Sequence, residues 1–92
     1  MIVIDMSKSH ILLDLITSND YPYTNMPLNK KEFFALENFI KENCLIFNKY
    51  EKEDKFEYKL EYEFLYKSKI ILLKHFKSYT SDEEYFLLRC EK

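Results

Sequence analysis

The alternation of hydrophobic and polar residues is clearest between positions 56 and 66. Even positions in this stretch are aromatic or apolar, and most odd positions are charged: Phe56, Tyr58, Leu60, Tyr62, Phe64 and Tyr66 against Glu57, Lys59, Glu61 and Glu63. A period of two over this length predicts a β-strand with one buried face and one wet face. Such a strand spans roughly 36 Å, so the rest of the chain is expected to pack on it or pair with it.

A second strand is predicted over residues 70–79, which are rich in Ile, Leu, Phe and Tyr. With a three-residue turn at 67–69, the hairpin pairs Tyr66 with Ile70, Phe64 with Leu72 and Leu60 with Phe76. This register places Lys74 on the apolar face. A register shifted by one residue would instead point His75 and Lys77 inward, so the pattern predicts the hairpin and leaves its register open.

A helical pattern follows Asn29. Asn29 is a good N-cap residue, and Glu32 stands at the third helical position, as in a capping box. The helix is predicted to run to about Asn43, which is available as a C-terminal cap in place of glycine. Its apolar stripe consists of Phe33, Leu36, Phe39 and Ile40, widened by Phe34 and Ala35. This stripe is expected to cover one face of the sheet.

The other elements are less sharply patterned. Residues 44–50 predict a strand that a charged connection at 51–55 joins to the long strand. Residues 85–90 predict a final strand, although Ser81 and Glu84 form a capping-box pattern that favours a helix there. Residues 18–27 predict an irregular loop, because no regular element is expected to survive Pro22 and Pro27.

The N-terminal region is predicted to be a hairpin. Residues 1–6 place Ile2, Ile4 and Met6 on one face, and residues 10–17 place Ile11, Leu13 and Leu15 on one face. A helix over the second run, capped by Ser7 or Ser9, is the alternative, because apolar residues also recur there at i,i+4. The predicted fold is a single α+β domain, 1–92, with an antiparallel sheet in ββαβββ order and one main amphipathic helix on one face.

Composition narrows the class of protein. The chain is 47% hydrophobic and 17% aromatic, which excludes a disordered chain. No run approaches the ~18 apolar residues of a membrane span, and the start lacks a basic signal-peptide region, so a cytoplasmic location is expected. Glycine is absent, which excludes glycine-dependent nucleotide-binding loops. Turns that need a positive φ are expected at Asn or Asp, for example at Asn19-Asp20 or Asn25.

Residues suited to catalysis or metal binding are few. Cys44 and Cys90 are far apart in sequence and predict two reduced thiols. His10 and His75 are the two histidines, and neither has further ligands at the spacing of a zinc site. No nucleophile carries a recognisable motif beside them. The sequence therefore predicts no enzyme activity, no cofactor and no metal.

Charge is segregated along the C-terminal half. Residues 51–63 carry six acids and three lysines, whereas residues 67–77 carry four lysines and no acid. Neighbouring strands of opposite charge can pair within the sheet, for instance Glu61 beside Lys74 or His75. The functional interpretation is an acidic strand face that binds a basic or nucleic-acid-binding protein, with effects mainly on rate and specificity. The predicted partner-binding residues are Glu57, Glu61, Glu63, Glu53 and Asp54, with Tyr21 and Tyr23 of the loop.

The leading hypothesis is a small protein-binding protein without enzyme activity. The chain is small and acidic, and it is rich in residues with AT-rich codons, such as Lys, Ile, Phe and Tyr. In these respects it resembles small inhibitors of phages and mobile elements, such as anti-CRISPR proteins, antitoxins and immunity proteins. That resemblance implies blockage of a partner's nucleic-acid-binding cleft. The alternative is a single-stranded nucleic-acid-binding protein that uses lysines and tyrosines, which the net charge of −2 disfavours. A homodimer formed through a long edge strand is a further possibility.

Overall fold

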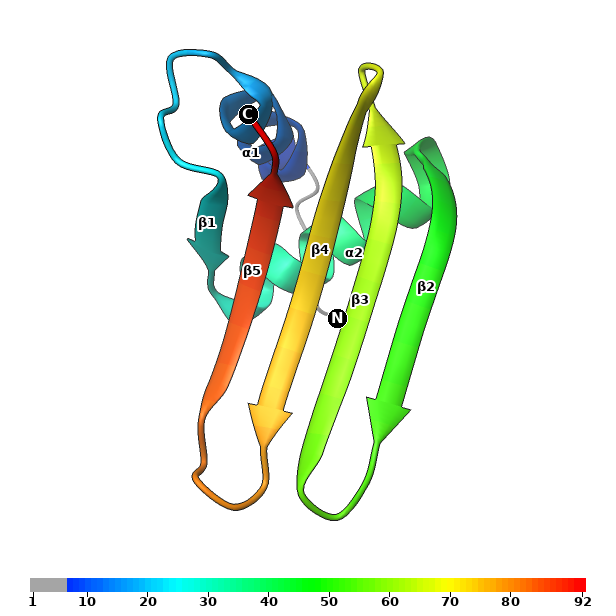
Figure 1. Ribbon diagram of the computed structural model, residues 1–92. Helices are drawn as coiled ribbons and strands as arrows, with labels where there is room; N and C mark the ends of the chain where they lie inside the picture. The colour runs from blue at the N-terminus through cyan, green and yellow to red at the C-terminus, as the bar shows by residue number, and fades with distance from the viewer. Residues whose placement is uncertain (1–6) are drawn as a thin grey trace.

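The computed structural model describes residues 7–92, which form a five-stranded antiparallel sheet and two helices. The elements are α1 (Ser7–Thr17), β1 (Asn25–Leu28), α2 (Lys30–Asn43), β2 (Leu45–Glu53), β3 (Glu57–Tyr66), β4 (Lys69–Ser78) and β5 (Glu84–Cys90). The strand order is β1-β5-β4-β3-β2, and both helices lie on the same side of the sheet (Figure 1). The α+β class is confirmed, whereas the ββαβββ order with one main helix is wrong.

The predicted start of α2 is confirmed in detail. The Asn29 side chain accepts a hydrogen bond from the Glu32 backbone, and the Glu32 carboxylate accepts one from the Asn29 backbone. This reciprocal pair satisfies two helix N–H groups and fixes the first turn. The C-terminal cap differs from the prediction, because the cap is extended Cys44, while Asn43 Nδ2 donates back to the Phe39 carbonyl.

The apolar stripe of α2 covers the sheet as expected. Phe33, Leu36 and Ile40 are buried in the core, and Phe39 is half-buried against it. Phe34 does not widen the stripe, since it is 39% exposed.

The strand predicted at residues 10–17 is wrong, because these residues belong to α1. The helix buries Leu13 and Ile16 completely and leaves Ile11 and Leu15 exposed. Two apolar residues three positions apart share one face of a helix but opposite faces of a strand. The core therefore selects the helical pattern that the sequence also contained. The strand predicted at residues 1–6 lies outside the described residues.

The loop predicted at 18–27 ends in a strand. In β1, Met26 lies opposite Leu88 and Leu28 lies opposite Phe86 of β5. Met26 and Leu28 are buried, while Pro27 points to the other side. A proline is tolerated because β1 is the edge of the sheet and needs no outward N–H bond. The expectation that no regular element survives Pro27 was therefore wrong.

The β3–β4 hairpin closes with two residues instead of three. Tyr66 pairs with Lys69, and Phe64 pairs with Ile71. The first of the two predicted registers is thus wrong, and the shifted register, with His75 on the helix side, is the one adopted. Lys67 and Ser68 both have positive φ, 50° and 67°. A two-residue turn with positive φ at both positions matches the twist of the strands. The strand pairing therefore imposes positive φ on Lys67 and Ser68, although Asn or Asp would be preferred at such positions.

The core lies between the helices and the inner face of the sheet, to which β1, β3, β4 and β5 all contribute. The even-numbered positions of β3 belong to this face. Leu60, Tyr62, Phe64 and Tyr66 are buried there, as the alternation predicted, whereas Phe56 precedes the strand and is exposed. Strand β2 extends three residues beyond its predicted end at Tyr50. The final strand is confirmed as β5, which pairs with β4 through Leu88 and Cys90.

Candidate functional site

One face of the sheet is covered by neither helix (Figure 1). We call it the open face. Its side chains come from the odd positions of β3 and from the positions paired with them. An uncovered sheet face with apolar side chains is a typical place for a macromolecular contact. It is therefore the first candidate for a functional surface in this fold.

An apolar row crosses three strands of the open face. Leu45 of β2 lies opposite Leu65 of β3, which lies opposite Ile70 of β4. Leu45 is 64% exposed and Ile70 is 59% exposed. The three side chains form adjacent cross-strand pairs at the end of the sheet next to the β3–β4 turn. We refer to Leu45, Leu65 and Ile70 as the apolar row.

The predicted acidic residues of β3 do share the open face, but each has a polar partner. Lys74 Nζ lies 3.5 Å from Glu61 Oε1, and Asn48 Nδ2 donates a 2.9 Å hydrogen bond to Glu63 Oε1. Glu57 pairs with Lys59 at 3.7 Å. The pairing of Glu61 with Lys74 was one of the contacts expected from sequence. The carboxylates are thus held in a band of mixed charge beside the apolar row.

Glu53 and Asp54 lie at the far end of the sheet, by the β2–β3 turn. Asp54 Oδ1 accepts hydrogen bonds from the backbone N–H groups of Phe56 and Glu57, which lowers the pKa of Asp54 and shapes the turn. The Tyr79 hydroxyl donates a 2.7 Å hydrogen bond to Glu53. Glu53 pairs with Tyr58, on the helix side of the sheet, so it does not extend the open face.

Tyr21 and Tyr23 are separated from these acids. The two rings meet edge to face, with centroids 5.5 Å apart, in the segment that leads into β1. Strand β1 is at the opposite edge of the sheet from β2. Lys92 Nζ lies over the Tyr21 ring at 5.5 Å from its centroid. The structure therefore does not bring the predicted tyrosines and glutamates together into one surface.

A cleft of about 390 Å³ opens on the helix side, between α2 and strands β2 to β4. Its walls come from four elements: Phe33, Phe34, Glu37 and Lys41 of α2, Lys49 and Glu51 of β2, Tyr58, Leu60 and Tyr62 of β3, and His75 of β4. Sequence reasoning did not find it, because the register and the helix position jointly decide which residues meet. The alternation that pointed Tyr58 and Tyr62 to the helix side was the available signal.

Polar groups in and beside the cleft are engaged with one another. The Tyr62 hydroxyl donates to Glu37 Oε2 at 2.6 Å, and the Tyr58 hydroxyl donates to Glu51 Oε2 at 2.7 Å. Burial first, and then the carboxylate partner, raises the pKa of both phenols, which keeps them protonated as donors. These groups are consequently arranged as donor–acceptor pairs that stabilise the cleft.

His75 lines this cleft and is held by two contacts. Its Nε2 lies 2.9 Å from Glu84 Oε2, and its ring stacks on Phe86 with centroids 4.4 Å apart. The His75 hydrogen bond lowers the pKa of Glu84. Within residues 7–92, no group of three or more His, Cys, Asp or Glu side chains could hold a metal ion.

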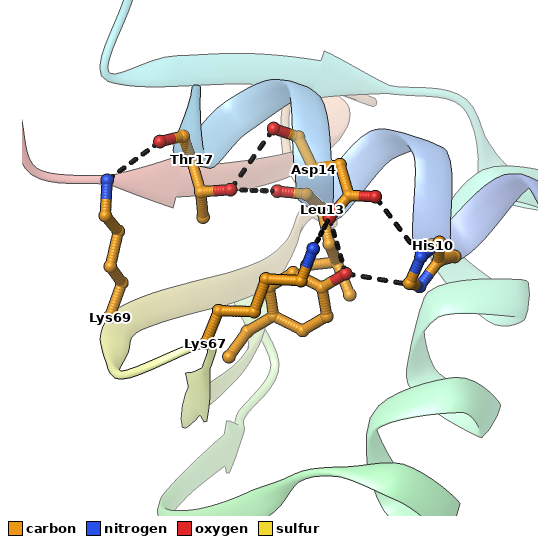
Figure 2. A network of polar contacts seen from close by, with 7 residues as sticks. His10, Leu13, Asp14, Thr17, Lys67 and Lys69 are labelled. Carbon is orange, nitrogen blue, oxygen red and sulfur yellow. Dashed lines mark hydrogen bonds and ion pairs between the residues drawn. The ribbon is translucent and has the colours of Figure 1, made fainter. Parts of the chain in front are cut away.

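A second polar cluster joins α1 to the β3–β4 turn (Figure 2). Asp14 Oδ1 accepts hydrogen bonds from Tyr66 at 2.7 Å and from Lys67 at 2.8 Å. His10 Nε2 lies 3.2 Å from Asp14 Oδ2, and His10 Nδ1 lies 3.2 Å from the Tyr66 hydroxyl. The Lys67 and Tyr66 hydrogen bonds lower the pKa of Asp14. This cluster fastens the helix to the hairpin.

The C-terminal end of α1 is also held by two lysines. Lys69 Nζ donates to the Thr17 carbonyl at 2.8 Å, as Figure 2 shows, and Lys92 Nζ donates to the Ser18 carbonyl at 2.8 Å. Cations at a helix C-terminus satisfy free carbonyls and interact favourably with the helix dipole. The contacts of both histidines and of these two lysines therefore all connect parts of the fold to one another.

Each cysteine is a free thiol. Cys44 is half-buried and Cys90 is buried. Burial raises the pKa of the Cys44 thiol, which keeps it in the less reactive protonated form.

No family model, curated protein or solved structure matches this chain. No helix in the part of the chain that the structure describes is both long and apolar enough to cross a membrane.

Proposed function

We propose that this protein binds another protein through the open face of its sheet. The observation that carries the proposal is that both helices cover one face, while the apolar row of Leu45, Leu65 and Ile70 lies on the other (Figure 1). Two of these three side chains expose more than half of their surface. Covering them with an apolar surface of a partner removes apolar area from water, a favourable transfer of about 25 cal/mol per Å² from which the ordering cost of association is subtracted.

The partner surface that fits is apolar at its centre and basic beside it. Glu61 and Glu63 stand next to the apolar row, and their carboxylates can accept hydrogen bonds from lysine or arginine of a partner. Lys74 and Asn48 compete for these carboxylates, so the acids contribute orientation and specificity more than affinity. This is the role expected for an inhibitor that occludes a basic, nucleic-acid-binding cleft.

Protein is favoured over single-stranded nucleic acid as the ligand. Phe76 and Tyr85 are aromatic residues on the open face that could stack on bases, but their rings stack on each other with centroids 5.1 Å apart. A base would have to replace that contact. The apolar row offers no hydrogen-bonding group to a base, whereas it suits the apolar centre of a protein interface.

A matched pair of variants tests the proposal. Ile70→Glu places a charge in the apolar row, and Ile11→Glu places the same charge on the outer side of α1, where Ile11 is 63% exposed. Each protein is immobilised and exposed to an extract of the cells that make it, once untreated and once treated with nuclease. We expect a protein captured by the wild type to be retained by Ile11→Glu and lost by Ile70→Glu. Equal capture by both variants, or capture that disappears on nuclease treatment, would overturn the proposal.

A second comparison tests the acidic part of the surface. Reversing charge at Glu57, Glu61 and Glu63 is expected to weaken binding of the captured partner. Reversing three exposed acids elsewhere, Asp20, Glu42 and Glu83, is expected to leave binding unchanged. If the first triple variant stays folded and binds as tightly as the second, the carboxylates of β3 have no part in the interface.

A further inference from the structure

The two edges of the sheet differ in how they are protected. Strand β1 has four residues and contains Pro27, both of which discourage pairing with another strand. Strand β2, at the other edge, has nine residues without proline and is exposed along almost its whole length. Among residues 7–92, no strand pairs with its outer side. An edge of this length is a ready template for a further strand.

The charges on β2 specify which strand fits. Along β2, Lys49 and Glu51 point to the helix side, and Tyr50 between them points to the open face. In antiparallel pairing with a second β2 about a two-fold axis through Tyr50, Lys49 of each copy lies opposite Glu51 of the other. We propose that this protein forms a symmetric dimer in which the β2 strands pair in this register. The proposal concerns the edge of the sheet and is independent of the protein-binding function of the open face.

Neighbouring symmetric registers are less favourable. An axis through Lys49, Glu51, Lys52 or Glu53 places that residue opposite its own copy, so like charges face each other across the strands. An axis through Asn48 brings no opposite charges together, and it crosses the irregularity between Ile46 and Asn48, where the β2–β3 register shifts. The Tyr50 register pairs residues 48–52 of the two copies without crossing that irregularity. It is the symmetric register that combines opposite-charge pairs with a regularly paired stretch of β2.

The side chains that would meet are already positioned. Glu51 accepts the hydrogen bond from the Tyr58 hydroxyl, and Lys49 Nζ lies 3.9 Å from Glu51 Oε1 and 5.6 Å from the Tyr62 ring centroid. Holding both groups in advance reduces the side-chain entropy lost on pairing. Tyr50 is 48% exposed, and the two copies of its ring would cover each other on the open face.

Charge reversal tests the register. Self-association of the wild type is measured by sedimentation equilibrium over a wide range of concentration at low salt. Lys49→Glu and Glu51→Lys each convert two attractive pairs into two repulsive ones, so each is expected to weaken the dimer by about tenfold or more. The double variant restores opposite charges across the axis and is expected to regain most of the lost affinity. A wild type that stays monomeric throughout, or a double variant no better than the singles, would overturn the proposal.

Cysteine cross-linking tests the same register without changing the charged pairs. In a Cys44→Ser background, Tyr50→Cys places two thiols directly opposite each other, at a Cα separation of about 4.5 to 5.5 Å that a disulfide can bridge. Lys52→Cys is the control, because in this register the two copies of position 52 are offset by four residues, roughly 13 Å. Rapid oxidation to a covalent dimer at position 50 and not at position 52 is the expected result. Equal cross-linking at both positions would contradict the register.

Discussion

The Tyr62 hydroxyl of β3 donates a 2.6 Å hydrogen bond to Glu37 Oε2 of α2. The Tyr62 side chain is 2% exposed, and Lys41 Nζ lies 3.8 Å from the same carboxylate. Glu37 therefore links the main helix to the central strand at the wall of the cleft. The contact joins the two elements that are most clearly predicted from sequence, and it fixes how one lies on the other.

Replacing Tyr62 with phenylalanine removes this hydrogen bond and leaves the ring in place. Because the acceptor is charged and the hydroxyl is buried, we expect Tyr62→Phe to lower the free energy of unfolding by about 1.5 kcal/mol. Tyr79→Phe removes a similar bond, to Glu53, from an exposed site and should change little. Urea denaturation of both variants provides the measurement. Equal losses in the free energy of unfolding would mean that the buried Tyr62–Glu37 hydrogen bond stabilises the fold no more than the exposed Tyr79–Glu53 bond does.

Stability is expected to fall steeply with pH above about 10. Burial raises the pKa of Tyr58, Tyr62 and Tyr66 above the ordinary value of 10.0, with a further rise from their carboxylate partners. In the unfolded chain these phenols lose their protons near pH 10, while in the folded protein they keep them. The unfolded state is therefore favoured increasingly as pH rises.

Ultraviolet absorbance of the ionised phenol can follow this titration, while circular dichroism follows unfolding of the chain. Of the eight tyrosines, these three are expected to ionise together with unfolding. Ionisation of all eight in a single step before any loss of circular dichroism would contradict the raised pKa values.

Asp14 contributes stability that acid removes. Hydrogen bonds from Lys67 and Tyr66 hold the pKa of Asp14 below its ordinary value of 3.8. The stabilisation by Asp14 is therefore fully present at pH values above the pKa that Asp14 has in the unfolded chain. It is lost as pH falls through the lower pKa that Asp14 has in the folded protein. We expect Asp14→Asn to be less stable than the wild type at neutral pH, and the difference to shrink below about pH 4.

Thermal denaturation across this pH range measures that difference. Asp20→Asn is the matched control, because the Asp20 side chain is exposed and makes no hydrogen bond to any of residues 7–92. If the stability difference between Asp14→Asn and wild type stays constant from neutral pH to about pH 2, well below the ordinary pKa of aspartate, the carboxylate charge is not involved.

The two-residue β3–β4 turn leaves room for a stabilising substitution. Ser68 has a φ of 67°, a conformation that costs a residue with a Cβ roughly 1 kcal/mol or more. Ser68→Gly should remove this strain and raise stability, partly offset by the greater freedom of glycine in the unfolded chain. Ser81 is an exposed serine outside the positive-φ residues, so Ser81→Gly should lower stability. Melting temperatures that shift in the same direction for both would contradict the assignment of strain to Ser68.

Part of the candidate surface was predictable from β3 alone. The period-two pattern places Glu57, Glu61 and Glu63 on one face, and the structure agrees. It could not decide whether Lys74 or His75 lies beside Glu61, because that depends on the β3–β4 register, which the sequence left open between two choices. It also could not place Tyr21 and Tyr23, whose distance from β3 depends on β1 joining the far edge of the sheet.

By itself, the sequence determined the elements whose signals are local and agree with one another. The capping box of Asn29 and Glu32 fixes the start of α2, and the alternation through Phe64 fixes the faces of β3, because neighbouring residues supply all the information needed. Tertiary structure decided the rest. At residues 10–17 the pattern fits both a helix and a strand, and burial of Leu13 and Ile16 in the core selects the helix. Such a choice depends on packing partners distant in sequence, because the free-energy difference between helix and strand from intrinsic propensity is smaller than that from burying apolar side chains.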